Sequence, residues 1–428
     1  MTDLQSIYFM IINNNIINYI LFFLLSMIPA SLISGPFLPD LFASLMGLMF
    51  IILNFNKIIN LKSYLNNFTI IFIIFYSLII LSTIFSYDPM VSLEYSLFYF
   101  RFLFFALCIS FLLSKNLSLL KYLILIFSLT FFVVYIDTII QYFNGKNLTG
   151  FPIDDHGGLN SFFGTNEDGI LGSYIVRLSP ILCSIIAFQY NSKLSHYYIL
   201  FIMLLSSVIP LFSQERAAFF LSFIPFFMYI FCTDTFSRKQ KIISILVFFI
   251  IFVIVFSLNS AVFVRYFNSI RDQIFNNNNF FIFSERHQAH YTSAIKMFLE
   301  EPMLGVGPKI FRYYCSDLRF YIEYACSTHP HNTYIQLLAE TGILVFSVIS
   351  SLFIYLISLT YKQFMAITFK KSSKYKSHFI LIISAMLVTL WPFTPTGSFF
   401  NNWLSVIYFL PVGFYLFYIK DNNHLQTK

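Results

Sequence analysis

The stretch KIISILVFFIIFVIVFSL, residues 241–258, decides the class of fold. After Lys241 it carries no charge, and apolar side chains would cover every face of the helix that it forms. Its length suits the hydrocarbon core of a bilayer, which takes about 20 apolar residues in helical form. A strand of a membrane barrel would alternate apolar and polar residues, and this stretch does not. We therefore expect a transmembrane helix that satisfies its own backbone hydrogen bonds.

The whole chain has the composition of an integral membrane protein. Of its 428 residues, 58% are hydrophobic and only 11% are charged, and 58 are phenylalanine. About a quarter of the residues of a soluble domain are charged, so no soluble core accounts for this apolar surface. About twelve apolar runs of spanning or near-spanning length predict an all-α bundle of transmembrane helices. They lie at 15–34, 37–54, 69–86, 97–114, 118–142, 169–188, 196–213, 216–232, 241–258, 333–360, 378–392 and 403–419.

Lysine and arginine predict the orientation of the bundle, because basic residues gather in cytoplasmic loops. With the N-terminus in the cytoplasm, the inside loops carry most of the basic residues, whereas the short outside loops carry only Lys146 and Arg216. Both termini are then cytoplasmic, and the net charge of +7 is a topology signal that requires no nucleic acid. The inside residues include Lys57, Lys115, Lys121, Lys193, Arg238, Lys239, Lys362, Lys371, Lys374, Lys376 and Lys428.

One outside segment, residues 259–332, is too long for a simple connection. Its aromatic residues, glycines and paired charges predict a small folded subdomain outside the membrane. The chain then divides into residues 1–258 with nine helices, the subdomain 259–332, and residues 333–428 with three helices and a cytoplasmic tail. Cys315 and Cys326 both fall in the subdomain. An oxidising compartment would allow a disulfide between them, and two free thiols are the alternative.

The sequence STHPHNTYIQLLAETGILVF, residues 327–346, places two histidines at the mouth of a predicted membrane helix. Asn332 is a good helix N-cap, so His331 stands one residue outside the helix. A histidine there titrates near neutrality and can take a proton from a hydroxyl, although a structural hydrogen-bonding role is the alternative. His329 makes a metal site conceivable. However, no HExxH motif or Cys/His cluster supports one, and we interpret the acidic pair Asp154 and Asp155 as loop solvation.

Charges beside the membrane carry the remaining functional signals, because they are costly there. Arg216 opens the eighth run, where it either contacts substrate or lies at the interface as a topology anchor. Arg286 begins a predicted amphipathic helix that includes Tyr291 and ends near Pro302. The following Gly305 and Gly307 indicate a tight turn. Arg101 and Arg177, inside apolar runs, form either structural ion pairs or substrate contacts, with Asp137 and Glu340 as possible partners.

The order of these motifs resembles the O-antigen ligase and O-antigen polymerase superfamily. An arginine at an outer helix end is followed by R-H-x-x-x-Y, by P-x-x-G-x-G and by H-P-H-N-x-Y-x-x-x-L-x-E-x-G, mainly within residues 205–350. WPFTPTGSFFNNW, residues 391–403, resembles the outside loop before the last helix of ligase-like members. Tyr291 departs from the pattern, since many members carry tryptophan there. The resemblance separates ligases from polymerases poorly. The His-Pro-His-Asn form and the loop at residues 391–403 favour a ligase.

The resemblance implies a GT-C-like glycosyltransferase of the bacterial inner membrane with a periplasmic active site. The donor would be an O-antigen chain on undecaprenyl pyrophosphate and the acceptor a sugar hydroxyl of lipid A–core. His331 would act as base or orienter, and Arg216 and Arg286 would hold the pyrophosphate. Arg312, Asn332, His329, Glu340 and Tyr291 complete the candidate substrate site, without a cofactor or metal. The alternatives are a polymerase that uses a second lipid-linked repeat as acceptor and, from another class, a transporter of lipid-linked sugars.

Overall fold

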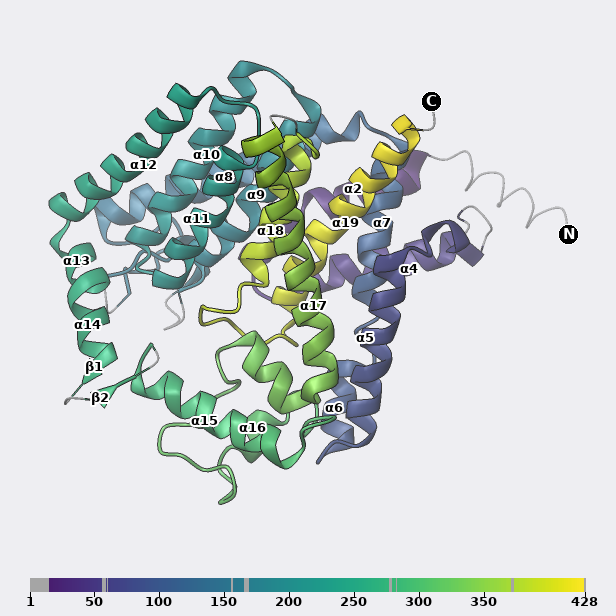
Figure 1. Ribbon diagram of the computed structural model, residues 1–428, viewed down its shortest axis with the longest axis vertical. Helices are drawn as coiled ribbons and strands as arrows, with labels where there is room; N and C mark the ends of the chain where they lie inside the picture. The colour runs from purple at the N-terminus through teal and green to yellow at the C-terminus, as the bar shows by residue number, and fades with distance from the viewer. Residues whose placement is uncertain are drawn as a thin grey trace, which may run out of the picture.

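The computed structural model describes residues 15–55, 59, 61–154, 157–164, 169–276, 279–281, 283–370 and 373–426. Lys57, Asp155, Lys371 and Lys428, named above, lie outside these ranges. The described chain is a bundle of α-helices with one antiparallel pair of two-residue strands (Figure 1). Its membrane helices are α2 (Asn15–Ser26), α3 (Ile28–Ile33), α4 (Phe37–Phe55), α5 (Asn67–Ile84), α7 (Arg101–Lys115), α8 (Leu119–Asn144), α9 (Leu171–Gln189), α10 (Lys193–Phe212), α11 (Arg216–Phe231), α12 (Arg238–Leu258), α17 (Thr333–Lys370), α18 (Ser377–Thr389) and α19 (Asn402–Gln426).

Shorter elements connect these helices. They are η1 (Leu61–Tyr64), α6 (Pro89–Ser96), η2 (Ser161–Phe163), α13 (Ser260–Phe263), the π-helical turn η3 (Val264–Asn268), α14 (Ser269–Ile274), β1 (Phe275–Asn276), β2 (Asn279–Phe280), α15 (Glu285–Glu300) and α16 (Phe311–Tyr314).

The all-α membrane fold expected from the sequence is confirmed. Within the described residues, 10 helical segments are long and apolar enough to cross a bilayer. Two shorter apolar helices, Arg216–Phe231 and Ser377–Thr389, complete the set of twelve predicted runs. α9 lies at the centre of the bundle, packed against α8, α10, α11 and α18. α5, α8 and α12 instead expose rows of isoleucine, leucine and phenylalanine, as lipid-facing helices do.

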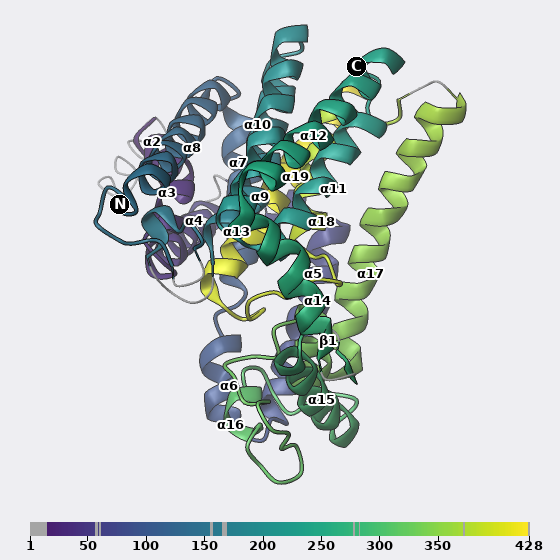
Figure 2. The same ribbon diagram turned by 90° about the vertical axis from the view of Figure 1, so that its left-hand side faces the viewer.

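A small subdomain projects from one end of the bundle. Figure 2 shows α6, α14, α15 and α16 gathered there, whereas the described C-terminus lies at the opposite end. Its core contains Met297, Ile310, Phe311 and Phe320, and Val91 of α6 packs against it. A disulfide joins Cys315 and Cys326, which settles the alternative that the sequence left open. We call this part of the molecule the outer subdomain.

α17 connects the outer subdomain to the opposite end of the bundle, and it is broken at Gly342. The backbone of Gly342 is non-helical, with φ 67° and ψ −173°. A short helix from Thr333 therefore precedes the long spanning part of α17, which Figure 2 shows rising along the edge of the bundle. The predicted helix start is confirmed, because the Asn332 side chain accepts the backbone N–H groups of Tyr334 (3.0 Å) and Ile335 (3.1 Å).

Arg101 has a structural partner that the sequence could not identify. Its Nε donates to Asp40 Oδ1 at 2.9 Å and its Nη2 to Asn402 Oδ1 at 3.1 Å, while Asn402 Nδ2 donates to Asp40 Oδ2 at 2.9 Å. This triad joins the first turns of α4, α7 and α19. Asp137 pairs with neither arginine: it accepts Leu148 N at 2.7 Å and Ser161 Oγ at 2.6 Å, and so holds the loop after α8.

Candidate functional site

The site is built around His331, in the last residues before α17. Its backbone has φ 56°, in the left-handed region that few residues other than glycine adopt. This conformation directs its carbonyl to Thr396, whose backbone N–H donates to it at 2.9 Å. The His331 ring bonds Ser327 Oγ through Nε2 at 3.0 Å. Strained backbone of this kind persists where the surroundings fix it, and it gathers at functional sites.

The loop between α18 and α19 makes most of the hydrogen bonds that hold this backbone in place. Thr396 accepts Thr333 N through its hydroxyl at 3.0 Å, and its carbonyl bonds His329 Nε2 at 3.0 Å. Asn332 Nδ2 donates to Pro392 O at 2.8 Å, and Gln336 bonds Ser398 and the backbone of Phe399. The loop that resembles the ligase-like pattern therefore holds the His-Pro-His-Asn segment directly, although 60 or more residues separate the two in the chain.

Four histidine rings meet at this point, two from the segment before α17 and two from α15. The ring centroid of His331 lies 4.1 Å from that of His329, 5.1 Å from His290 and 5.7 Å from His287. His290 Nδ1 is bonded to the carbonyl of Ala325 at 2.7 Å. The resemblance had placed Arg286 and Tyr291 of α15 in one site with His331, but not the two histidines of α15. Among the described residues, no three His, Cys, Asp or Glu side chains converge as metal ligands.

The environment of the cluster favours neutral imidazoles. Burial, then the rings of His331 and His290 and the charge of Arg216, lower the pKa of His287 from 6.5 to about 4. Burial and His331 likewise lower the pKa of His329 to about 3, with Lys309 and Arg312 contributing. Both rings are therefore uncharged at neutral pH, and a neutral histidine can accept a proton.

Arg216 and Arg265 form a cationic group on the α11 side of the cluster. Arg216 Nη2 donates to Gln273 Oε1 of α14 at 2.7 Å, and Arg265 of η3 lies within electrostatic range of Arg216. The Nε of Arg265 is buried without a hydrogen-bond partner in the described part of the chain. Because the helix dipole disfavours a cation at a helix N-terminus, the stability of α11 does not account for Arg216.

Four further arginines, three of them predicted above and the fourth Arg319, occupy different surroundings. Arg286 is exposed in the first turn of α15, where its charge acts on His290. Arg312 is half-buried in α16 and its charge reaches His329. Arg319 is exposed and paired with Asp317 at 2.9 Å, away from the cluster. Arg177 is buried in α9, bonded to Ser173, and its Nε has no hydrogen-bond partner among the described residues.

Glu340 and Tyr291 lie inside the protein. Glu340 is fully buried, and its carboxylate accepts Gln336 Nε2 at 2.8 Å and the backbone N–H of Phe311 at 3.4 Å. These bonds position the turn after α15 beside the start of α17. Tyr291 packs near His287, with ring centroids 6.2 Å apart, and its buried hydroxyl has no partner in the described residues.

The turn at Gly305 and Gly307 packs directly on α17. Val306 N donates to Ala339 O and Gly307 N to Glu340 O, each at 2.9 Å. Both glycines have positive φ, 68° and 113°. A Cβ on Gly305 would overlap the backbone of α17, and one on Gly307 would overlap Ser86. The tight turn expected from the sequence is thus also the contact that holds α15 and α16 against the histidine segment.

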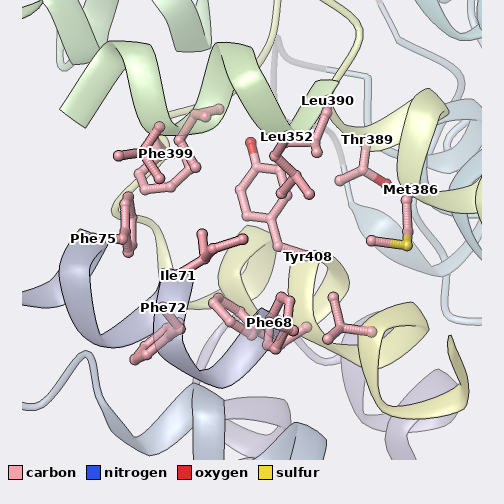
Figure 3. A pocket seen from close by; sticks show the side chains of 14 residues that line it. Phe68, Ile71, Phe72, Phe75, Leu352, Met386, Thr389, Leu390, Phe399 and Tyr408 are labelled. Carbon is pink, nitrogen blue, oxygen red and sulfur yellow. The ribbon is translucent and has the colours of Figure 1, made fainter. Parts of the chain in front are cut away.

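An apolar pocket with a cavity volume of about 80 Å³ opens beside the site, between α5, α17, α18 and α19 (Figure 3). Phenylalanine, isoleucine and leucine side chains line most of it. Two of its lining residues also contact the first turns of α17, directly after His331 and Asn332: Tyr408 OH lies 3.3 Å from Thr333 Oγ1, and Phe399 N donates to Gln336 Oε1 at 2.8 Å. The pocket and the polar site therefore share a wall.

Sequence reasoning missed Arg265, His290 and Lys309. Arg265 and His290 stand in stretches whose side chains could face any direction until the fold of the outer subdomain is known. Lys309 offered a signal, since a lysine directly after the Gly-x-Gly-Pro turn must lie close to whatever that turn packs against. It is buried beside His329 and Arg312.

Residues 201–350 match the family model described as O-antigen ligase. The match begins in α10 and ends in α17, so it contains Arg216, Arg265 and the histidine cluster. No curated protein matches the chain. The match supports a membrane enzyme of the ligase or polymerase type that acts on lipid-linked glycans. Over these residues the chain is similar to the O-antigen ligase superfamily, in agreement with the resemblance of its motifs.

Proposed function

We propose that this protein is an O-antigen ligase with a GT-C-like fold. It transfers an O-antigen polysaccharide from undecaprenyl pyrophosphate to a sugar hydroxyl of lipid A–core. The acceptor oxygen bonds to C1 of the donor sugar as the bond from C1 to the pyrophosphate oxygen breaks. The hydroxyl proton passes to the protein, and the electron pair leaves with undecaprenyl pyrophosphate. The observation that carries the proposal is the position of His331 among three other histidines, one of which, His287, lies within electrostatic range of Arg216.

His331 accepts the proton of the acceptor hydroxyl. Its φ of 56° and its bond to Ser327 fix the ring. Burial and nearby positive charge keep His287 and His329 neutral, so no charged imidazole of these two opposes the proton that His331 accepts. His329 and Asn332 position His331 through the loop 391–401, and Glu340 positions the turn that faces it.

Arg216 and Arg265 hold the pyrophosphate as it gains charge. Planar guanidinium groups bind phosphate oxygens in pairs and remain charged at every physiological pH. Arg265 keeps a buried Nε without a partner in the described chain, so it has a donor to offer. Arg286, exposed at the start of α15, contributes from the open side. The arginines take the place that a divalent cation fills in other phosphate chemistry.

The apolar pocket accepts part of the isoprenoid tail. Lipid-facing α5 and α17 form two of its walls, and Tyr408, which lines it, lies within hydrogen-bond distance of Thr333 at the start of α17 (Figure 3). A polyprenyl chain that enters between α5 and α17 would bring its pyrophosphate to the outer end of the bundle. Burial of the tail in this pocket would stabilise the bound donor by about 25 cal/mol for each Å² of apolar surface removed from water.

We assign the outer subdomain to the periplasm and the protein to the bacterial inner membrane. Lysine-rich ends, at the starts of α12 and α18, lie on the side of the bundle opposite the outer subdomain (Figure 2). Positive charge favours the cytoplasm, so both termini are cytoplasmic.

Lipopolysaccharide analysis tests the proposal. The chain is expressed in cells that make undecaprenyl-linked O-antigen and lipid A–core but lack their own ligase. A restored ladder of O-antigen on lipid A–core is expected. Core without O-antigen, with longer chains on the undecaprenyl carrier, would identify a polymerase instead. Unchanged core and unchanged chains would leave transport and overturn the enzyme.

A further inference from the structure

A second pair of cations lies on the His329 side of the cluster, apart from Arg216 and Arg265. Lys309 has 6% of its surface exposed, and Arg312 buries an Nε that has no hydrogen-bond partner among the described residues. Neither belongs to any ion pair formed within the described ranges. A buried cation is costly unless it is paired, so this pair calls for an anion.

The fold imposes the position of Lys309. Its backbone has φ 65°, a conformation that lysine rarely adopts. The preceding turn is fixed on α17 by the bonds of Val306 and Gly307, and Ser92 Oγ donates to Pro308 O at 3.0 Å. The Lys309 ammonium lies 5.2 Å from the ring centroid of Tyr95 in α6. These contacts hold the charge in one place, as a binding site requires.

Glu340 does not serve as the counter-ion. The charge of Glu340 raises the pKa of Lys309, but the two groups lie beyond ion-pair distance. The Glu340 oxygens accept hydrogen bonds from Gln336 Nε2 and Phe311 N instead. Burial lowers the pKa of Lys309 to about 8 against the attraction of Glu340, with Arg312 adding repulsion. The protein therefore compensates these two positive charges incompletely.

We propose that Lys309 and Arg312 form an anion subsite that binds a phosphate or carboxylate group of the acceptor glycan. The inference rests on the proposed transferase function. The donor pyrophosphate is bonded to the lipid tail, so it must remain near the bundle, where α11 begins with Arg216. α6 and α16, which carry Tyr95 and Arg312, lie in the outer subdomain, at the end of the molecule opposite the described C-terminus (Figure 2). An anion there belongs to the carbohydrate beyond the membrane surface.

The test is a kinetic comparison with purified enzyme in detergent, in which donor and lipid A–core acceptor are varied separately. Lys309→Met should raise the KM for the acceptor at least about tenfold, the effect of losing one charged hydrogen bond of about 1.4 kcal/mol. The KM for the donor should stay within about twofold, since no donor contact is lost. Lys309→Arg should restore most of the acceptor affinity. Arg319→Gln removes one positive charge from an exposed position of the same subdomain, and it should behave as wild type.

The possible outcomes separate the two proposals. A wild-type acceptor KM in Lys309→Met, or a rise in the donor KM instead, would overturn the acceptor subsite and leave the transferase intact. No transfer by the wild-type protein would overturn the proposed function and this subsite with it. If Lys309→Met does not accumulate in the membrane, Arg312→Gln at its half-buried position decides the same question with the same two KM values.

Discussion

The imidazole rings of His329 and His331 lie with their centroids 4.1 Å apart, on either side of Pro330. They differ in their partners. His329 is fixed between Thr328 and the carbonyl of Thr396, so both of its nitrogens are engaged inside the protein. His331 bonds Ser327 and faces the two histidines of α15. In the proposed mechanism, His331 takes the proton and His329 positions it.

Replacement of His331 by alanine should abolish transfer while the protein remains in the membrane. Loss of a general base lowers turnover by a factor on the order of 10² to 10⁴. The measurement is the O-antigen ladder in cells, followed by turnover of the purified variant. His196→Ala is the matched control. His196 lies in the first turn of α10, at the end of that helix away from Arg216, and its ring bonds Tyr229. Full activity of His331→Ala would remove His331 from the mechanism.

Arg216→Lys should also lose most of its activity, although it keeps the charge. A lysine ammonium is a point charge that cannot reproduce the paired hydrogen bonds of a guanidinium. We expect turnover to fall on the order of 10-fold or more, from the lost charged hydrogen bond. Arg238→Lys, at the exposed start of α12, provides the control. Wild-type turnover in Arg216→Lys would reduce Arg216 to a topology anchor.

Acidification should destabilise the outer subdomain through its histidines. The pKa of His287 is about 4 and that of His329 about 3 in the folded protein, below the ordinary value of 6.5. Between pH 6.5 and pH 4 the unfolded chain therefore binds more protons than the folded one, so the free energy of unfolding falls as the pH falls. Above pH 6.5 this effect vanishes.

Thermal melting in detergent, at several values between pH 7.5 and pH 4.5, measures this dependence. His287→Asn should melt at a temperature that changes less with pH than that of the wild type, since one depressed histidine is gone. A melting temperature of the wild type that stays constant or rises on acidification would contradict the low pKa values.

The sequence was sufficient for the membrane bundle but only for part of the site. Twelve apolar runs, the Asn332 cap and the Gly305–Gly307 turn could be predicted because each depends on neighbours in the chain. The pairing of Arg101 with Asp40 and the contact of α15 histidines with His331 depend on how distant segments pack, which no local pattern encodes. Lys309 was missed for a related reason. A lysine is unusual only when it is buried, and its burial depends on how the outer subdomain packs on α17.

Gly307→Ala should destabilise the protein much more than Gly145→Ala. Both glycines have positive φ, 113° and 73°, so each alanine adds backbone strain of about 1 kcal/mol. A Cβ at Gly307 would in addition overlap Ser86, whereas one at Gly145 meets open space. Overpacking adds about 1–3 kcal/mol. Melting temperatures in detergent compare the two variants. Because Gly307 holds the turn that lies on Glu340 and precedes Lys309, its alanine variant should also lose transfer activity, and Gly145→Ala should keep it. Equal melting temperatures for the two variants would mean that the turn yields at little cost, and the histidine segment would then need another support.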